Sequence, residues 1–558
     1  MHDSGRVRRG DSGAIISGTL LRLRIFAVSI VVLSSLVPFA GFGRQSIAPT
    51  GVPVDADRPT NRIVLILPFH NDSKAPGLEW VGEAFPEVMR QQMQSSSIFV
   101  ISREDRLYAF DRVGIPASAQ LSRATLLRIA EQMDVDFVVL GSYNYDGSIF
   151  SAKAQLLDMR RLHLSPAVTE SGSLLQLIDI QAATAWDLMH EMQPTSVATK
   201  QDFVSETKDI RLDALENYVR GVIDVSTSDK IHHLKEAVRL SPSYTVATLQ
   251  LGKTYFDQRD YASAIAWFSK IPGADKHATE ANFFLGLSAY YTGDMARSDQ
   301  AFRLVAARLP LTEVYNNLGV VNARQGKSSA VEYLERAVQA DPTDEDYHFN
   351  LGIALAHSRD NVGAIRQLKE ALDLRPSDGD AKAVLESLSN SSSPAGRLPA
   401  ERIKRNYDEA SFRQLAFAVE SAEEAQMAHA DPKKHAAMHV DLGKEKFRQG
   451  FYEEARDNFR KALALDPENG DAHVGLANAQ IALNDLESAR SELDSTLKTQ
   501  PNSDAYVALG ELDLRENKLD AANDDVAQAL RMEPSNNAAL QLKQQVTARL
   551  NATSQRNP

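Results

Sequence analysis

Hydrophobic and small residues recur at a fixed period through the middle of the chain. Between residues 244 and 376 the pair Leu-Gly appears four times, at steps of 34, 33 and 33 residues, and proline follows at a similar step. A period in this range is typical of a solenoid built from stacked repeats. The recurring positions are Leu251-Gly252, Leu285-Gly286, Leu318-Gly319 and Leu351-Gly352, with Pro310, Pro342 and Pro376 behind them.

Within one unit the pattern predicts two antiparallel helices. Counting from Gly352, Ala364 comes twelve residues later, and Leu368, Ala371 and Pro376 follow. A glycine allows two helices to cross closely, the large apolar residue fills the space between units, and proline ends the second helix. Gly443 is followed by Ala455, Phe459, Ala462 and Pro467 at the same offsets.

This order of residues resembles the tetratricopeptide repeat, and the resemblance implies an all-α solenoid in two arrays. We expect the first array at residues 210–388, with about five repeats and a cap, and the second at 431–550, with about three repeats and a capping helix. Residues 389–430 are expected to form a Ser-rich linker and one long helix from Glu401 to His429, and 551–558 a disordered tail.

Residues 1–43 have the pattern of a targeting segment. Arg6, Arg8, Arg9, Arg22 and Arg24 precede an uncharged apolar run from Ile25 to Val37, and small residues follow. This order is typical of a signal peptide, while the length up to Gly43 also allows a retained membrane anchor. Either alternative predicts export to the periplasm or cell envelope, with a polar linker at 44–61.

Between residues 62 and 195 the pattern predicts a small α/β domain with a mixed sheet and a trailing helix. Apolar runs at Ile63–Leu67, Ile98–Ile101 and Phe137–Gly141 predict buried strands, and helical spacing separates them. The alternation from Ser148 to Asp158 predicts a hairpin strand after Asp146-Gly147. Four sequence stretches resemble the TolB amino-terminal type of domain, which implies a role in protein interaction or envelope assembly: ILPFHNDS (66–73), LEWVG (78–82), VDFVVLGS (135–142) and AQLLD (154–158).

Composition and charge exclude several functions. The formal charge is −13; residues 1–43 carry five Arg and two Asp, a net +3, so the remainder stands at −16. This balance opposes binding to nucleic acid, despite the small basic cluster Arg402, Lys404 and Arg405. The chain has no Cys, which excludes disulfides and thiolate chemistry.

No catalytic motif is visible, so we expect neither an enzyme nor a cofactor or metal site. His232-His233 point in different directions on a helix. His435 and His439 are four residues apart and can share one helix face, but they lack the Glu and the third ligand of a zinc helix, which favours an ordinary surface helix.

The repeats therefore predict binding of protein or peptide partners in a concave groove. The resemblance implies groove positions six and three residues before each Gly, and one, four and five after it. We expect a non-catalytic scaffold; the alternative is a regulatory protein in which the α/β domain binds a small molecule and the arrays relay it. The expected groove residues are Leu249, Lys253, Phe256, Asn316, Val320, Phe349, Ile353, Val440, Lys444 and Phe447.

Overall fold

A computed structural model describes most of the chain after the first sixty residues. The predicted targeting segment (1–43) and linker (44–61) lie outside the described residues. Those described are 62–73, 75–93, 98–116, 121–192, 199–205, 210–389, 398–427, 430–449, 451–483 and 485–554.

The amino-terminal part is a small α/β domain with the predicted mixed sheet. The strand order is β3-β1-β4-β5-β6, with β2 paired to β4 and β7 to β5. β1, β3 and β4 are parallel, and β4 and β5 form an antiparallel hairpin. The strands are β1 (Arg62–Ile66), β2 (His70–Asn71), β3 (Ile98–Val100), β4 (Phe137–Tyr145), β5 (Phe150–Asp158), β6 (His163–Leu164) and β7 (Val168–Gly172).

Both faces of this sheet are covered by helices, which explains the continuous apolar run of β1. Val64 and Ile66 pack on one side in a core shared with α2 (Val81–Met93) and α5 (Leu177–Met192). Leu65 packs on the other side with α3 (Arg103–Arg112) and α4 (Arg123–Gln132). α3 begins at its N-cap, Ser102, and the sequence pattern did not predict this short polar helix. The 3₁₀ turn η1 (Leu174–Gln176) precedes α5, and α6 (Lys200–Ser205) follows it.

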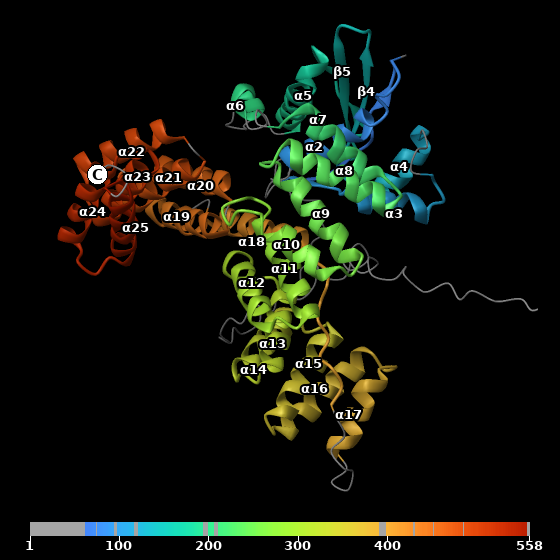
Figure 1. Ribbon diagram of the computed structural model, residues 1–558, viewed down its shortest axis with the longest axis vertical. Coiled ribbons are helices and arrows are strands. Elements are labelled where there is room, and N and C mark those ends of the chain that lie inside the picture. The colour runs from blue at the N-terminus through green and yellow to red at the C-terminus, as the bar shows by residue number, and fades with distance from the viewer. Residues whose placement is uncertain are drawn as a thin grey trace, which may run out of the picture.

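Five antiparallel helix pairs and a closing helix form the first array within residues 210–389 (Figure 1). The helix crossings have the expected origin: a Cβ built on Gly319 would lie 2.4 Å from the Leu334 side chain. The pairs are α7 (Leu212–Ile223) with α8 (Thr227–Leu240), α9 (Thr245–Asp257) with α10 (Tyr261–Phe268), α11 (Ala278–Thr292) with α12 (Met295–Arg308), α13 (Thr312–Arg324) with α14 (Ser329–Ala340) and α15 (Glu345–His357) with α16 (Asn361–Leu374), closed by α17 (Gly379–Ser389).

The α/β domain and the first repeat share one hydrophobic core. Residues of α2 and α5 pack with Leu215 and Val219 of α7 and with Leu234 of α8. The buried Tyr218 hydroxyl donates to Glu87 Oε2 of α2 at 3.0 Å. The domain is therefore fixed to the start of the solenoid by packing.

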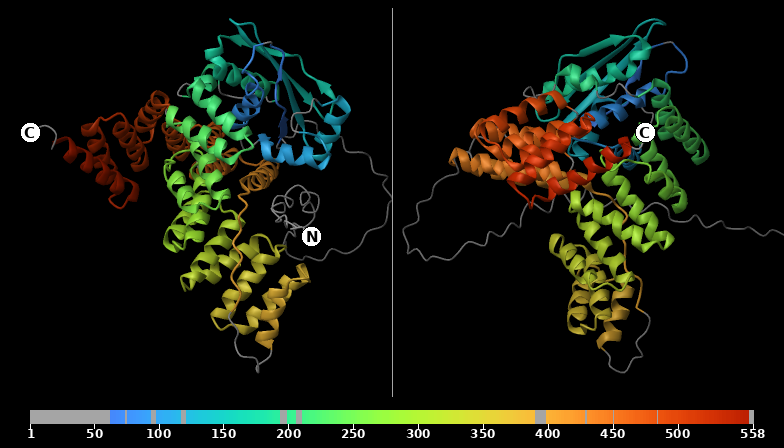
Figure 2. Two further views of the ribbon diagram at one scale, coloured as in Figure 1. Left: turned by 45° about the vertical axis from the view of Figure 1, so that its right-hand side comes forward. Right: turned by 60° about the vertical axis from the view of Figure 1, so that its left-hand side comes forward.

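The second array diverges sideways from the first (Figures 1 and 2). The predicted linker helix, α18 (Glu409–Met427), precedes it, but it begins at Glu409 and not at Glu401. The last helix continues to Ser554, past the predicted end at 550. The helices are α19 (Pro432–Gln449), α20 (Tyr452–Leu465), α21 (Gly470–Ala482), α22 (Leu486–Thr499), α23 (Ser503–Arg515), α24 (Leu519–Met532) and α25 (Asn537–Ser554).

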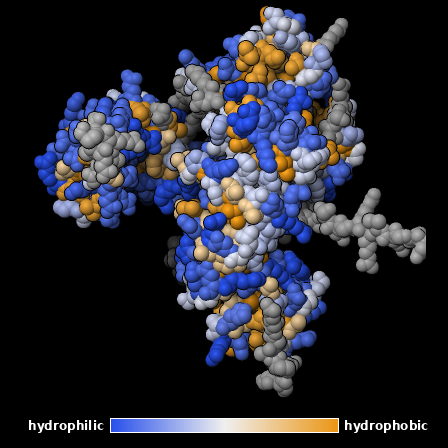
Figure 3. Space-filling view, viewed as in Figure 1, coloured by the Kyte–Doolittle hydropathy of each residue, from blue (hydrophilic) through white to orange (hydrophobic). Residues whose placement is uncertain are grey.

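The face shown in Figure 3 is mostly hydrophilic, with a gathering of hydrophobic residues over the α/β domain. No helix in the described part of the chain is long and apolar enough to cross a bilayer.

Candidate functional site

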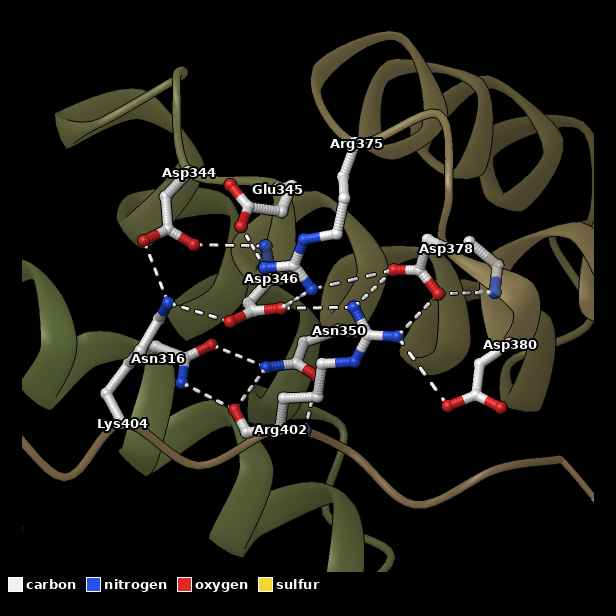
Figure 4. Close-up of polar contacts among 11 residues, drawn as sticks. Asn316, Asp344, Glu345, Asp346, Asn350, Arg375, Asp378, Asp380, Arg402 and Lys404 are labelled. Carbon is white, nitrogen blue, oxygen red and sulfur yellow. Dashed lines mark hydrogen bonds and ion pairs between the residues drawn. The ribbon is translucent and has the colours of Figure 1, made fainter. Parts of the chain in front are cut away.

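Residues 398–408, here called the groove segment, lie extended along the first array. The segment crosses the array beside α13 and α15 before the chain enters α18 (Figures 1 and 4). It contains no regular secondary structure. Its main chain and its side chains contact residues that are 24 to 149 positions earlier in the sequence. The groove therefore holds a peptide, and that peptide belongs to the same chain.

Asparagine side chains from two helices pair with the main chain of the groove segment. Asn350 Nδ2 donates to Arg402 O at 2.7 Å, and Arg402 N donates to Asn350 Oδ1 at 2.7 Å. Asn317 closes the same two bonds with Lys404, each at 2.8 Å. Asn316 Nδ2 adds a second donor to Arg402 O at 3.0 Å. A carboxamide that pairs with both the N–H and the C=O of one residue holds extended main chain of any sequence.

The side chain of Arg402 enters an acidic pocket between α15 and the start of α17. Its guanidinium reaches Asp378 at 2.6 and 2.8 Å and Asp346 at 3.0 Å. The same group lies 3.7 Å from the centre of the Phe349 ring. Because a planar guanidinium can donate to two carboxylates at fixed angles, this pocket favours Arg over Lys.

The electrostatics of this pocket favour the bound cation. The bond from Arg402 lowers the pKa of Asp378 below its usual value. Burial opposes the charge of Arg402, but the bonds to Asp378 and Asp346 outweigh burial and raise its pKa. The pocket is therefore complementary to a guanidinium.

Lys404 lies on the same side of the extended segment, as alternation along a strand requires. Its Nζ contacts Asp344 Oδ2 at 2.8 Å and Asp346 Oδ2 at 2.9 Å. Both the lysine and its two partners are largely buried. Figure 4 shows Asp346 between the two cations, with Arg375 on its other side.

The intervening residues turn to an aromatic and aliphatic surface. Ile403 and Tyr407 pack against the hydrophobic core of repeats two to four. The Tyr407 ring lies 5.3 Å from that of Phe283, and Arg405 lies over Phe256 at 5.3 Å. The groove thus presents acids to Arg402 and Lys404 on one side of the peptide, and a mainly apolar and aromatic surface to Ile403, Arg405 and Tyr407 on the other.

At the C-terminal end of the groove segment, the main chain bonds to the buried side chain of Glu313. Asp408 N donates to Glu313 Oε1 at 2.8 Å. Burial raises the pKa of Glu313 to about 7. With the segment docked, Glu313 is only 7% exposed.

Comparison with known proteins identifies the repeats. A family described as tetratricopeptide repeat matches residues 327–379 in the first array, and a second family of the same description matches residues 446–512 in the second. Both stretches are tetratricopeptide repeats. No relative was found among curated proteins.

Solved TPR structures resemble parts of the chain. The crystal structure of MamA is 23% identical, with a TM-score of 0.26, over 27% of this chain and 89% of MamA. YrrB, described as a TPR protein with an unusual peptide-binding site, is 17% identical, with a TM-score of 0.29, over 37% of this chain and 100% of YrrB. The first TPR of Spaghetti (RPAP3), bound to an HSP90 peptide, is 26% identical, with a TM-score of 0.20, over 21% of this chain and 95% of that structure.

The predicted groove residues of the first TPR array fall into two groups. Asn316, Phe349 and Phe256 contact the groove segment. The remainder are engaged within the array: Leu249, Val320 and Ile353 are buried, and Lys253 Nζ pairs with Glu280 at 2.9 Å.

In the second array Val440 is buried, Phe447 packs beside it, and Lys444 pairs with Asp471 at the surface. Their role in partner binding stays a prediction.

Sequence reasoning missed the occupant of the groove and two of its anchoring acids, Asp344 and Asp378, whereas Asp346 lies six residues before Gly352, at a position that the pattern supplies. The sequence pattern predicts a helix from Glu401 that includes the basic cluster Arg402, Lys404 and Arg405, whereas in the structure these residues form the bound peptide. Asp378 and Asp344 lie outside the groove positions that the family pattern supplies. The sequence does contain one indication of this contact. A short basic run occurs together with an asparagine in the first helix of each of two successive repeats, Asn317 and Asn350.

The cavity at the junction of the α/β domain and the array is small. It measures about 80 Å³ and is lined by Val88, Ile178, Leu215 and Tyr244, among others. Sites for small organic ligands usually measure about 300 to 1,000 Å³. This cavity gives no support to the alternative in which the domain senses a small molecule.

Proposed function

We propose that this protein is an exported, non-catalytic TPR scaffold, and that its first groove receives extended basic segments of protein partners in place of its own groove segment. The observation that carries the proposal is the pairing of Asn317 and Asn350 with main-chain groups of residues 402 and 404. These bonds do not depend on the side chains of the bound peptide. An outside peptide can therefore form the same bonds.

The side-chain pockets define the chemistry of such a partner. The acidic pocket of Asp344, Asp346 and Asp378 fits Arg and Lys two residues apart. The rings of Phe256 and Phe283 fit an aromatic residue and a stacked cation farther along. The preferred ligand is an extended segment of the pattern Arg-x-Lys-Arg-x-Tyr. Because charge pairs contribute to this recognition, affinity falls as ionic strength rises.

The proposed cellular setting of this scaffold rests on two sequence features. The basic, apolar and small-residue order of residues 1–43 supports export, with the segment either cleaved or retained as an anchor. The stretches at 66–73 and 135–142 resemble the TolB amino-terminal type of domain, which supports a role in the cell envelope. In this setting the α/β domain docks to one envelope component while the TPR grooves bind others.

The test measures binding of a fluorescent peptide with the sequence of residues 398–408 to the full-length protein. Arg402→Ala/Lys404→Ala weakens the resident segment but leaves the groove acids intact, and we expect it to bind the added peptide at least tenfold more tightly than wild type. The matched control adds Asn350→Ala, which damages the groove itself, and we expect it to lose that gain. Far-UV circular dichroism checks that each variant folds.

The same titration gives the results that would overturn the proposal. Equal affinity of wild type and the double variant would mean that the groove does not take peptide from outside. Equal affinity of the double and triple variants would place the peptide elsewhere on the protein.

A further inference from the structure

Two histidines and a glutamate meet where the linker helix α18 packs against the first helix of the second array. His435 and His439 lie four residues apart on α19, and Glu424 comes from α18. Their ligand atoms all lie within 4.8 Å of one another. The sequence shows the two histidines but not the carboxylate, because Glu424 reaches them only through the packing of α18.

The contact geometry directs three donor atoms to one point. Glu424 Oε1 lies 3.2 Å from His435 Nε2, and Glu424 Oε2 lies 3.3 Å from His439 Nε2. The two imidazole rings are stacked with centroids 4.9 Å apart, so their Nε2 atoms face the same side. The side chains of His435 and His439 are 13% and 3% exposed, whereas Glu424 is 44% exposed and leaves a path to solvent.

A neighbouring amide fixes the proton position on His439. Asn458 Nδ2 donates to the carbonyl of Glu454 at 2.9 Å, so Asn458 Oδ1 faces His439 Nδ1 at 3.2 Å. Nδ1 must then carry the hydrogen. In the neutral ring, Nε2 presents its lone pair to a carboxylate oxygen at 3.3 Å, an arrangement that either a proton or a metal ion between the two atoms would stabilise. A hydrogen bond from the distal ring nitrogen is also the usual support of a metal-binding histidine.

Other repeats show what an ordinary histidine does at the equivalent position. His348 and His473 lie at the same place in their repeats, and each turns Nε2 to the carbonyl of a preceding proline, at 3.0 and 2.9 Å. His439 lies on the first helix of the second array, where no repeat precedes it, and its Nε2 faces Glu424. The second histidine and the carboxylate together distinguish this position from its counterparts.

We infer that Glu424, His435 and His439 bind a divalent transition-metal ion, with Zn²⁺ the best match. Two imidazole nitrogens and one carboxylate oxygen form a ligand set typical of zinc, and the exposed side of Glu424 leaves a fourth position for water. The ion would join α18 to the second array, beside the buried ion pair of Lys446 with Glu420. This site is independent of the peptide groove.

The experiment uses tag-free full-length protein stripped with a chelator and titrated with ZnCl₂ against a chromophoric competitor. We expect one equivalent of Zn²⁺ bound at micromolar or tighter affinity, a raised melting temperature, and a visible cobalt absorption when Co²⁺ replaces Zn²⁺. His435→Gln and Glu424→Gln should each weaken binding at least tenfold. His473→Gln is the matched control, because His473 pairs with a single carboxylate, Glu492, and it should bind as wild type does.

Three results would overturn the inference. Wild type that binds no zinc would show that a proton alone is shared by the three residues. Unchanged binding in Glu424→Gln, whose exposed side chain tolerates replacement, would place the ion elsewhere. Loss of binding in His473→Gln would mean that the zinc is held by a different set of histidines.

Discussion

Replacement of Asn350 by alanine tests the central contact of the groove. The substitution removes both hydrogen bonds between its carboxamide and the main chain of Arg402. The carbonyl of Arg402 keeps Asn316 as a donor, so the N–H is the group that loses its partner. At about 0.5 to 1.5 kcal/mol for each net hydrogen bond, we expect docking of the segment to weaken by about 1 to 2 kcal/mol. This loss corresponds to about 5- to 30-fold in the docking equilibrium.

Hydrogen exchange of the full-length protein measures this change directly. The amides of Arg402, Lys404 and Asp408 donate to Asn350, Asn317 and Glu313, so they should be protected in wild type. In Asn350→Ala, exchange across residues 401–408 should accelerate by the same 5- to 30-fold, because opening of the segment becomes easier.

Asn282→Ala is the control for this experiment, since the Asn282 side chain bonds within its own helix, to the carbonyl of Ala278. It should leave the exchange of the segment unchanged. Unprotected exchange of these amides in wild type would refute the docked arrangement. Equal exchange in Asn350→Ala and wild type would refute the role given to the carboxamide.

Three further predictions concern protonation, a buried charge and helix packing. Burial raises the pKa of Glu313 to about 7, and the docked segment covers this carboxyl, so docking should take up a proton; it should weaken by up to about tenfold between pH 6 and pH 8 by hydrogen exchange, and Glu313→Gln should abolish this dependence. Arg106 is buried and contacts Glu83 at 2.6 Å and the carbonyl of Ile66 at 3.0 Å; Arg106→Ala should destabilise the α/β domain by about 3 to 5 kcal/mol in urea unfolding, and a cost below 1 kcal/mol would contradict this account. Gly319→Ala places a methyl group 2.4 Å from a leucine side chain and should cost about 1 to 3 kcal/mol, whereas Gly273→Ala, with open space around it, should be close to neutral in the same denaturation measurement.

The solenoid could be predicted from sequence because its signals are local. Gly319 and its counterparts recur at a fixed step, and each meets a large residue fifteen or sixteen positions later in the paired helix. The buried strand β1 could be predicted equally directly from its continuous apolar run, because its alternate residues face two separate hydrophobic cores.

The groove segment could not be predicted in the same way. Ile403 and Tyr407 are four residues apart, which satisfies a helix as well as an extended chain with alternating sides, and the pattern favoured a helix from Glu401. What decides the extended form is the pairing of its main chain with Asn317 and Asn350, which lie 87 and 52 residues away. The contact of Glu424 with the two histidines depends on helix packing for the same reason.

The path of the groove segment has a mechanical consequence for the first array. A TPR solenoid normally behaves as a one-dimensional chain in which each repeat is stabilised by its neighbours, so it can unzip from an end. The segment instead touches Phe256 of α9, Phe283 of α11, Asn317 of α13, Asn350 of α15 and Asp378 beyond α16. It therefore links repeats that are not neighbours in the array, such as the second and the fifth. With the segment bound, the array should resist stretching and unfold as a single cooperative unit. Once the segment is displaced, the same helices should extend under a lower force.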